Sequence, residues 1–260
     1  MGRHVVVIAA VLLCGWPSSP LHAAPAPGDP QTLMFGEHRI DWRGADRSGG
    51  AGDDVAVSLK TNRGPIAGRY HRARATVSRH RAGVIWLSGS GGGVDGPARG
   101  LYAEASQRLQ QQGIASLRLD YRKPQDLPGC VLDALCGVAF FAQEGIDRVI
   151  VVGQSFGGAV AICTGASSPR VRAVVALSSQ TSGSVQMAPF VAPRPLLIVQ
   201  GTRDKVLPPQ NAREIYAAAR QPKELRYFND AGHNLILARE PLLELLLQWI
   251  PQHLRRPPVQ

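Results

Sequence analysis

From residue 83 onward, short apolar segments alternate with longer segments that fit helices. The apolar segments read as strands, at residues 84–87, 115–119, 149–152, 173–177, 196–199 and 225–228. The helices fit between and after them, at residues 97–112, 131–144, 156–165, 209–220 and 241–254. Near-continuous apolar strands interleaved with helices are typical of a mainly parallel sheet covered on both faces. The alternation therefore predicts an α/β fold.

The part of the chain before residue 83 has a different character. Strands are expected at residues 37–42, 55–60 and 66–71, and we predict that they form antiparallel strands at the N-terminal edge of the sheet. Residues 25–36 begin with a proline-rich stretch and are expected to be a disordered linker. Because no internal repeat or second composition change follows, we predict one α/β domain over residues 37–260.

The first 24 residues have the three-part layout of a secretory signal peptide. Arg3 gives a positive start, residues 5–16 form an apolar core too short to span a membrane, and small residues follow at Ala23 and Ala24. Cleavage near these alanines would export the protein to the periplasm or the medium. An uncleaved segment that anchors the protein to a membrane is the alternative. No apolar run of 18 residues occurs in the body, so no membrane span is expected after cleavage.

Composition excludes several partners. The formal net charge is +10, but the arginines are scattered and no aromatic-interleaved basic motif accompanies them, so no nucleic-acid partner is expected. Cysteine and histidine show no metal-ligand spacing, and no metal is expected. Cys130 and Cys136 are six residues apart. In one helix they would be separated by about 9 Å along its axis, so they can pair only if Cys130 precedes the helix.

Ser155 lies in the sequence Gly-Gln-Ser-Phe-Gly-Gly at residues 153–158, directly after an apolar strand and before a helix. This is the G-x-S-x-G arrangement in its expected context of strand, sharp turn and helix. Glycines are needed two positions either side of the serine, because side chains there would collide where the strand and the helix cross. The pattern predicts an exposed serine hydroxyl at the carboxyl edge of the sheet.

A serine hydroxyl needs a positioned base to act as a nucleophile at neutral pH. His233 follows the last predicted strand, and a loop at the carboxyl ends of the strands is where the base must lie to reach Ser155. The other histidines lie in the predicted signal peptide, in or beside the early strands, or at the end of the last helix in a polar tail: His4, His22, His38, His71, His80 and His253. His233 is therefore the predicted base.

The base needs an acid to orient it, and two aspartates compete for that role. Asp204 follows the strand at residues 196–199, so a separate strand end can present its carboxylate to the imidazole. Asp230 precedes His233 by only three residues and fits a role in shaping its own turn. Asp204 is the preferred acid.

The remaining requirement is an oxyanion hole made of backbone N–H groups. Phe156, the residue after the serine, is one predicted donor. The second donor is expected from the glycine-rich loop at residues 88–97, with Ser90 preferred and Gly91 next. This loop lacks the Lys-Ser/Thr ending of a phosphate-binding P-loop and the spacing of a dinucleotide fingerprint. A nucleotide cofactor is therefore not expected.

With these residues identified, the chain resembles the α/β-hydrolase superfamily from about residue 55 to residue 254. The glycine-rich loop, the serine turn and the acid and base at their strand ends carry the resemblance. The loop and the compact size look most like dienelactone-hydrolase-like and acyl-CoA-thioesterase-like members. The resemblance implies an α/β-hydrolase fold and a serine hydrolase that needs no cofactor. Dienelactone hydrolases typically use cysteine as nucleophile, whereas this chain has Ser155.

Only 14 residues separate Ser179 from Arg194, where many lipases insert a lid. A fairly open site without a large lid is expected, and residues 187–191 either line an apolar wall or pack on the sheet. The predicted function is hydrolysis of a small carboxylic ester or thioester through an acyl-enzyme. A peptidase or an acyltransferase with the same three residues is the alternative, and a non-catalytic binding protein is the alternative of another class. The sequence leaves the acyl and leaving groups and the oligomeric state open.

Overall fold

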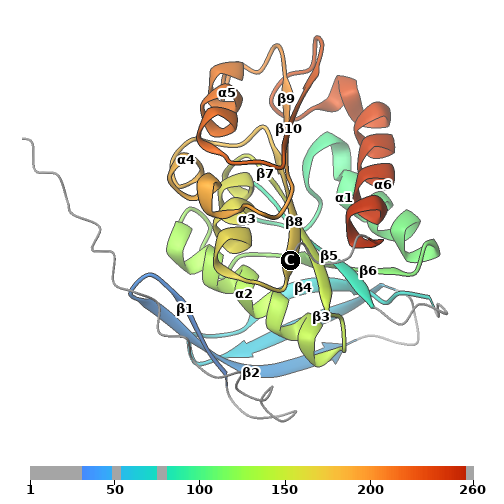
Figure 1. The fold of residues 1–260 in the computed structure, drawn as a ribbon. Coiled ribbons are helices and arrows are strands. Elements are labelled where there is room, and N and C mark those ends of the chain that lie inside the picture. The colour runs from blue at the N-terminus through green and yellow to red at the C-terminus, as the bar shows by residue number, and fades with distance from the viewer. Residues whose placement is uncertain (1–30, 49–53, 75–80, 256–260) are drawn as a thin grey trace, which may run out of the picture.

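The computed structural model describes residues 31–48, 54–74 and 81–255. Ten strands pair into one sheet, in the order β1-β2-β3-β4-β6-β5-β7-β8-β9-β10 (Figure 1). The strands are β1 (Gln31–Phe35), β2 (His38–Ser48), β3 (Asp54–Thr61), β4 (Ile66–His71), β5 (Ala82–Leu87), β6 (Ile114–Leu119), β7 (Arg148–Gln154), β8 (Val171–Leu177), β9 (Leu196–Gly201) and β10 (Lys223–Phe228).

The helices are α1 (Pro97–Gln111), α2 (Leu127–Gln143), α3 (Phe156–Ser167), α4 (Ser184–Met187), α5 (Pro209–Ala218) and α6 (Arg239–Arg255). Two 3-10 turns, η1 (Ala188–Phe190) and η2 (Ile236–Ala238), accompany them. Strands β1 to β4 are antiparallel, β4 joins β6 antiparallel, and the pairs from β6 to β10 are parallel. The expected α/β-hydrolase fold, with antiparallel strands at its N-terminal edge, is confirmed.

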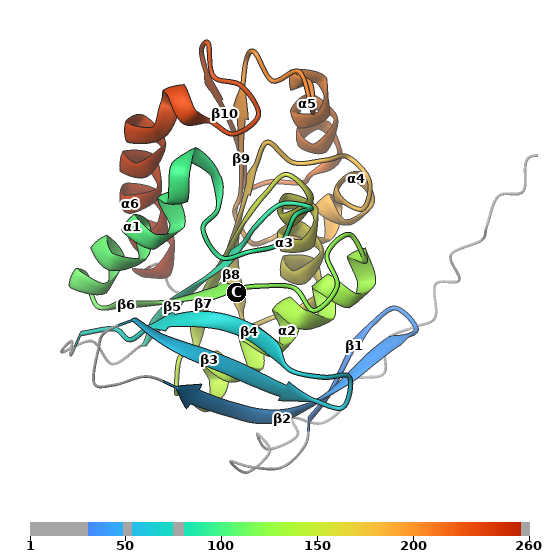
Figure 2. The ribbon, with the colours of Figure 1, turned by 180° about the vertical axis from the view of Figure 1, so that it is seen from behind.

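The sheet is covered on both faces, as the apolar strands predict. Helices α1 and α6 lie on one face, and α2, α3 and α5 lie on the other (Figures 1 and 2). Successive side chains of β7 alternate between the two layers. Val149 and Val151 enter the core beneath α2 and α3, while Ile150 and Val152 enter the core beneath α1 and α6. All four are fully buried, which explains why this strand has no polar face.

The structure corrects the expected linker at residues 25–36, because residues 31–35 form the edge strand β1. Leu33 and Phe35 alternate along this strand and pack against the core, and Gly36 takes a positive φ of 57° in the turn to β2. This alternation, rather than the proline content before it, decides the local structure. Residues 25–30 and the predicted signal peptide at residues 1–24 lie outside the described residues.

Helix α2 begins at Leu127, four residues before the predicted start. The Asp126 carboxylate accepts a hydrogen bond from the Gly129 N–H at 3.3 Å and caps the helix, and Pro128 is compatible with the first turn. Cys130 therefore lies inside the same helix as Cys136. Both are free thiols, so the condition for a disulfide between them is not met.

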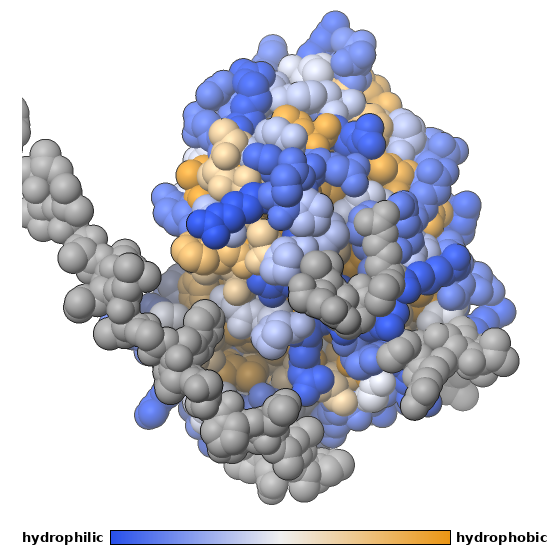
Figure 3. Space-filling model, in the orientation of Figure 1, coloured by the Kyte–Doolittle hydropathy of each residue, from blue (hydrophilic) through white to orange (hydrophobic). Residues whose placement is uncertain are grey.

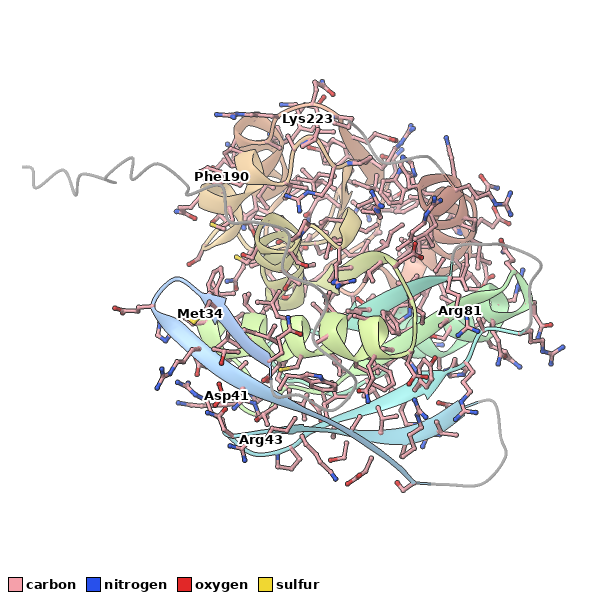
Figure 4. The ribbon with its side chains drawn as sticks, turned by 60° about the horizontal axis from the view of Figure 1, so that its bottom comes forward. Met34, Asp41, Arg43, Arg81, Phe190 and Lys223 are labelled. Atoms are coloured by element: carbon pink, nitrogen blue, oxygen red, sulfur yellow. The ribbon has the colours of Figure 1, made fainter. Side chains whose placement is uncertain are left out.

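The segment between β8 and β9 contains only α4 and η1 and forms no large lid. Val191 is buried and Met187 packs against the core, whereas Phe190 is 59 % exposed and lies at the surface (Figure 4). Apolar surface gathers around α4 on a face that is otherwise mostly hydrophilic (Figure 3). Within residues 31–48, 54–74 and 81–255, no helix is long and apolar enough to cross a bilayer.

Candidate active site

Three loops at the carboxyl edge of the parallel strands bring the predicted triad residues together. Ser155 follows β7, Asp204 follows β9, and His233 follows β10. The His233 Nε2 atom lies 3.0 Å from the Ser155 hydroxyl oxygen, and its Nδ1 atom lies 2.8 Å from a carboxylate oxygen of Asp204. Both distances are those of hydrogen bonds. The three side chains therefore form one continuous relay from hydroxyl to carboxylate.

Ser155 occupies a strained turn between β7 and α3. Its φ of 58° and ψ of −120° are unusual for a residue with a side chain. The two glycines around it are required by backbone contacts: a Cβ on Gly153 would lie 1.9 Å from the Gly157 carbonyl oxygen, and a Cβ on Gly157 would lie 2.3 Å from the Ser88 carbonyl oxygen. Gly153 is thus required where β7 meets the start of α3, and Gly157 is required where α3 meets the end of β5.

The Asp204 carboxylate is buried and held by several donors. One oxygen accepts the N–H groups of Val206 and Leu207 at 2.9 and 2.8 Å, and the other accepts the Gln200 amide at 2.9 Å as well as His233. These bonds orient the carboxylate toward the imidazole. Asp230 instead forms an exposed ion pair with Arg203 at 2.7 Å.

The loop that carries Asp204 and the loop that carries His233 are joined through their backbones. The Arg203 N–H donates to the Ala231 carbonyl oxygen at 2.9 Å. A Cβ on Gly201 would lie 2.3 Å from that same oxygen, so only glycine permits this approach. On the other side, the Ala98 N–H at the distorted start of α1 donates to the Asn234 carbonyl oxygen at 2.9 Å. His233 is therefore held between α1 and the loop of Asp204.

The predicted oxyanion donors come from two segments next to Ser155. Phe156 is the first residue of α3, where the helix leaves backbone N–H groups without partners. The glycine-rich loop runs close to the serine, since a Cβ on Gly89 would lie 3.4 Å from the Ser155 Cβ. Across the part of the chain that the structure describes, the Ser90 and Gly91 N–H groups meet no protein acceptor. They are available to a bound oxyanion.

Ser155, His233 and the glycine-rich loop border a cleft of about 340 Å³. Its walls consist of the glycine-rich loop and of residues next to the serine and the base: Ser88, Gly89, Ser90, Gly91, Gly92, Gly93, Val94, Asp95, Gly96, Gln154, Ser155, His233 and Asn234. The lining is mostly backbone and polar side chains, and residues 187–191 contribute none of it. Such a cleft suits a small substrate rather than a long acyl chain.

Two glutamines near the triad were not predicted. The Gln154 amide nitrogen lies 3.4 Å from His233 Nε2 and 3.5 Å from the His233 carbonyl oxygen. Gln200 is fully buried and donates to Asp204 and to the Leu207 carbonyl oxygen. Both residues follow long apolar stretches of β7 and β9, and a polar residue at the end of a buried strand is the signal that could have identified them.

Comparisons with known proteins agree with this architecture. A family model described as the dienelactone hydrolase family matches residues 101–242, more than half of the chain. An uncharacterised protein of Salmonella typhi, YfhR, is 33 % identical over a match that covers 34 % of this chain and 40 % of that protein. A YfhR protein of Escherichia coli O157:H7 is 31 % identical, over 38 % of its length. The chain thus spans about two fifths of the length of these curated relatives.

Solved structures share the fold at low sequence identity. The dienelactone hydrolase of Anabaena variabilis superposes with a TM-score of 0.67 at 20 % identity, covering 78 % of this chain and 98 % of that one. An esterase domain from a Rhodothermus marinus protein gives a TM-score of 0.61 at 19 % identity, covering 76 % of this chain and 98 % of that one. At these identities the likeness shows the fold.

Proposed function

Since this chain belongs to the dienelactone hydrolase family, we propose that it is a serine hydrolase that cleaves a small carboxylic ester or thioester. The observation that carries the proposal is the relay of Ser155, His233 and Asp204, with its two hydrogen bonds of 3.0 and 2.8 Å. Serine in place of the family's usual cysteine nucleophile needs this relay, because a hydroxyl is a weak nucleophile without a base.

In the first half of the reaction, the Ser155 oxygen attacks the substrate carbonyl carbon and passes its proton to His233 Nε2. The Asp204 carboxylate stabilises the imidazolium that forms. The negative charge on the carbonyl oxygen is held by the N–H groups of Phe156 and Ser90, with Gly91 as the neighbouring donor. The carbon–oxygen or carbon–sulfur bond then breaks, and the leaving group takes the proton from His233.

In the second half, water enters the position of the leaving group. His233 removes a proton from this water, and the hydroxide attacks the acyl carbon in the same oxyanion hole. When the tetrahedral intermediate collapses, His233 returns the proton to Ser155 and the acid leaves. The cleft of about 340 Å³ and the short segment between β8 and β9 support a small substrate without a lid. No cofactor takes part in this scheme.

Hydrolysis of p-nitrophenyl esters of graded chain length, and of a short acyl thioester, tests the proposal. We expect short acyl chains to be turned over best and Ser155→Ala to abolish turnover. Ser167→Ala, at the far end of α3, is the matched control and should keep wild-type kcat. Full activity in Ser155→Ala would remove this residue from the nucleophilic role. Addition of an amine acceptor separates hydrolysis from acyl transfer or peptide chemistry.

We further propose export through the leader at residues 1–24, on the sequence pattern alone. Expression of the full chain followed by N-terminal sequencing of the exported protein tests this. A new N-terminus near Ala23 or Ala24 is expected. Retention of Met1 in membrane-bound protein would instead support the uncleaved anchor.

A further inference from the structure

The segment directly after β6 holds the glycine-rich loop at two points, one at its start and one near its middle. The Tyr121 hydroxyl donates a hydrogen bond to the Ser88 carbonyl oxygen at 3.0 Å, where the loop leaves β5. The neighbouring Asp120 carboxylate accepts the Gly93 N–H at 2.6 Å, near the middle of the loop. The two expected oxyanion donors of this loop, Ser90 and Gly91, lie between these two attachments.

Tyr121 also contacts the other half of the expected oxyanion hole. Its ring meets the Phe156 ring edge to face, with 5.9 Å between centroids and an interplanar angle of 89°. Phe156 carries the backbone N–H that follows the nucleophile. One side chain therefore touches both segments that supply oxyanion donors, through its hydroxyl on one side and its ring on the other.

The position of Tyr121 is itself well determined. The next residue, Arg122, donates its backbone N–H at 3.0 Å and its Nε–H at 2.6 Å to the Asp133 carboxylate of α2. Asp133 is buried, so this pair ties the segment to the core. Tyr121 is 6 % exposed, and its burial raises the pKa of the phenol well above the ordinary value. The hydroxyl therefore remains a donor throughout the pH range in which esters are assayed.

We propose that Tyr121 is a positioning residue of this site, which sets the separation between the oxyanion donors of the glycine-rich loop and the N–H of Phe156. This inference rests on the proposed ester hydrolysis and assigns a role in it to a residue outside the triad. Glycines at 89, 91, 92 and 93 leave the loop little steric restraint of its own. Without the Tyr121 hydroxyl, the peptide after Ser88 can rotate and carry the Ser90 N–H away from the developing charge.

Tyr121→Phe tests the inference, because it removes the hydroxyl and keeps the ring. Displaced oxyanion donors stabilise the transition state less well but hardly change the binding of the ground-state substrate. We therefore expect kcat to fall by about 10-fold to 100-fold while KM stays within about threefold. The affinity of a trifluoromethyl ketone that mimics the tetrahedral intermediate should fall by the same factor as kcat/KM. A purely structural role would not produce this parallel loss.

Tyr102→Phe is the matched control. The Tyr102 hydroxyl donates to the Leu87 carbonyl oxygen at 3.2 Å, one residue before Ser88, but its ring packs on Trp86 in the other layer. This variant also loses a buried hydrogen bond at the end of β5, and we expect near wild-type kcat and inhibitor affinity. Equal losses in both variants, or unchanged kcat and inhibitor affinity in Tyr121→Phe, would overturn the positioning role.

Asp120 supplies a second test that does not depend on the folding of Tyr121→Phe. Asp120→Asn keeps a side-chain oxygen for the Gly93 N–H and should retain most of kcat, whereas Asp120→Ala should lose kcat without a large change in KM. Equal kcat in the two Asp120 variants would contradict a loop held on both sides of Ser90 and Gly91. If the wild-type enzyme turned over no ester and no thioester, the proposed function would fail first and this role with it. An active wild type with unaffected variants would remove the positioning role alone.

Discussion

Asp204 and Asp230 belong to the two loops that meet at His233, and their surroundings differ sharply. The Asp204 side chain is fully buried and receives three protein N–H donors in addition to the imidazole. The Asp230 side chain is 61 % exposed and faces Arg203. A buried carboxylate with satisfied oxygens can set the tautomer and orientation of an imidazole, whereas an exposed ion pair contributes little to either.

Asp204→Asn should therefore lower kcat by about 10³-fold to 10⁴-fold with little change in fold, because the amide favours the wrong imidazole tautomer. Asp230→Asn is the matched control and should stay within about twofold of the wild type. Steady-state hydrolysis of a short p-nitrophenyl ester measures both. Comparable losses in the two variants would show that the burial of Asp204 does not distinguish the acid.

The sequence predicts the triad side chains because each follows an apolar strand, and parallel strands end at one edge of a sheet. The supporting residues do not follow from this rule. Tyr121 and Gln200 act by donating to carbonyl or carboxylate oxygens that lie on other segments or on the far side of a turn. Which oxygen each of these side chains reaches depends on distances in the folded structure. The periodic pattern of apolar residues in the sequence carries no information about those distances.

Among the helices and strands, the site depends on how closely α3 approaches β7 and the end of β5. A side chain at Gly153 would overlap the first residues of α3, and a side chain at Gly157 would overlap the carbonyl oxygens at the end of β5. The same close approach places Ser155 at the amino end of α3, next to the Phe156 N–H. The backbone geometry of Ser155 is thus a property of the packed elements rather than of the serine alone.

Gly157→Ala should destabilise the protein by about 3 kcal/mol or more, since the added methyl group overlaps the carbonyl oxygens of Leu87 and Ser88. Gly232→Ala is the comparison for stability, because its Cβ would meet nothing closer than 3.9 Å. Urea unfolding followed by circular dichroism measures both. An equal, small change in the two variants would contradict the steric origin of the motif.

The ends of helices and strands can be predicted where the periodic apolar pattern runs through the whole element. They are harder to predict where a capping residue or a strand partner sets the end. The start of α2 at Leu127 depends on the Asp126 cap, and β1 depends on pairing with β2 across Gly36. The short α4 and η1 have too few residues to show a period. The long helices and the central strands, by contrast, lie close to their predicted ranges.

At the scale of the whole molecule, the two-sided core includes free, buried thiols at Cys130, Cys136 and Cys163. Burial raises the pKa of Cys163 from an ordinary value of 9.0 to about 12. Between these values the unfolded chain releases the thiol proton and the folded chain retains it. Stability from this group is therefore fully present below about pH 9 and is lost as the pH rises toward 12.

We expect the free energy of unfolding to fall as the pH rises above 9, by up to about 1.4 kcal/mol per pH unit for each such thiol. Cys163→Ala should show a shallower decline than the wild type. Urea titrations at pH 8, 9 and 10 compare the two slopes, which separates this effect from the packing cost of the substitution. Identical slopes would indicate that Cys163 ionises equally easily in the folded protein.

The proposed mechanism requires that Ser155 forms a covalent acyl-enzyme through its contact with His233. The most direct measurement is peptide mapping by mass spectrometry after a fluorophosphonate probe has reacted with the native protein. We expect one adduct on Ser155, formed much more slowly in His233→Ala and absent in Ser155→Ala. An adduct on another residue, or an unmodified wild-type protein at saturating probe, would contradict this mechanism.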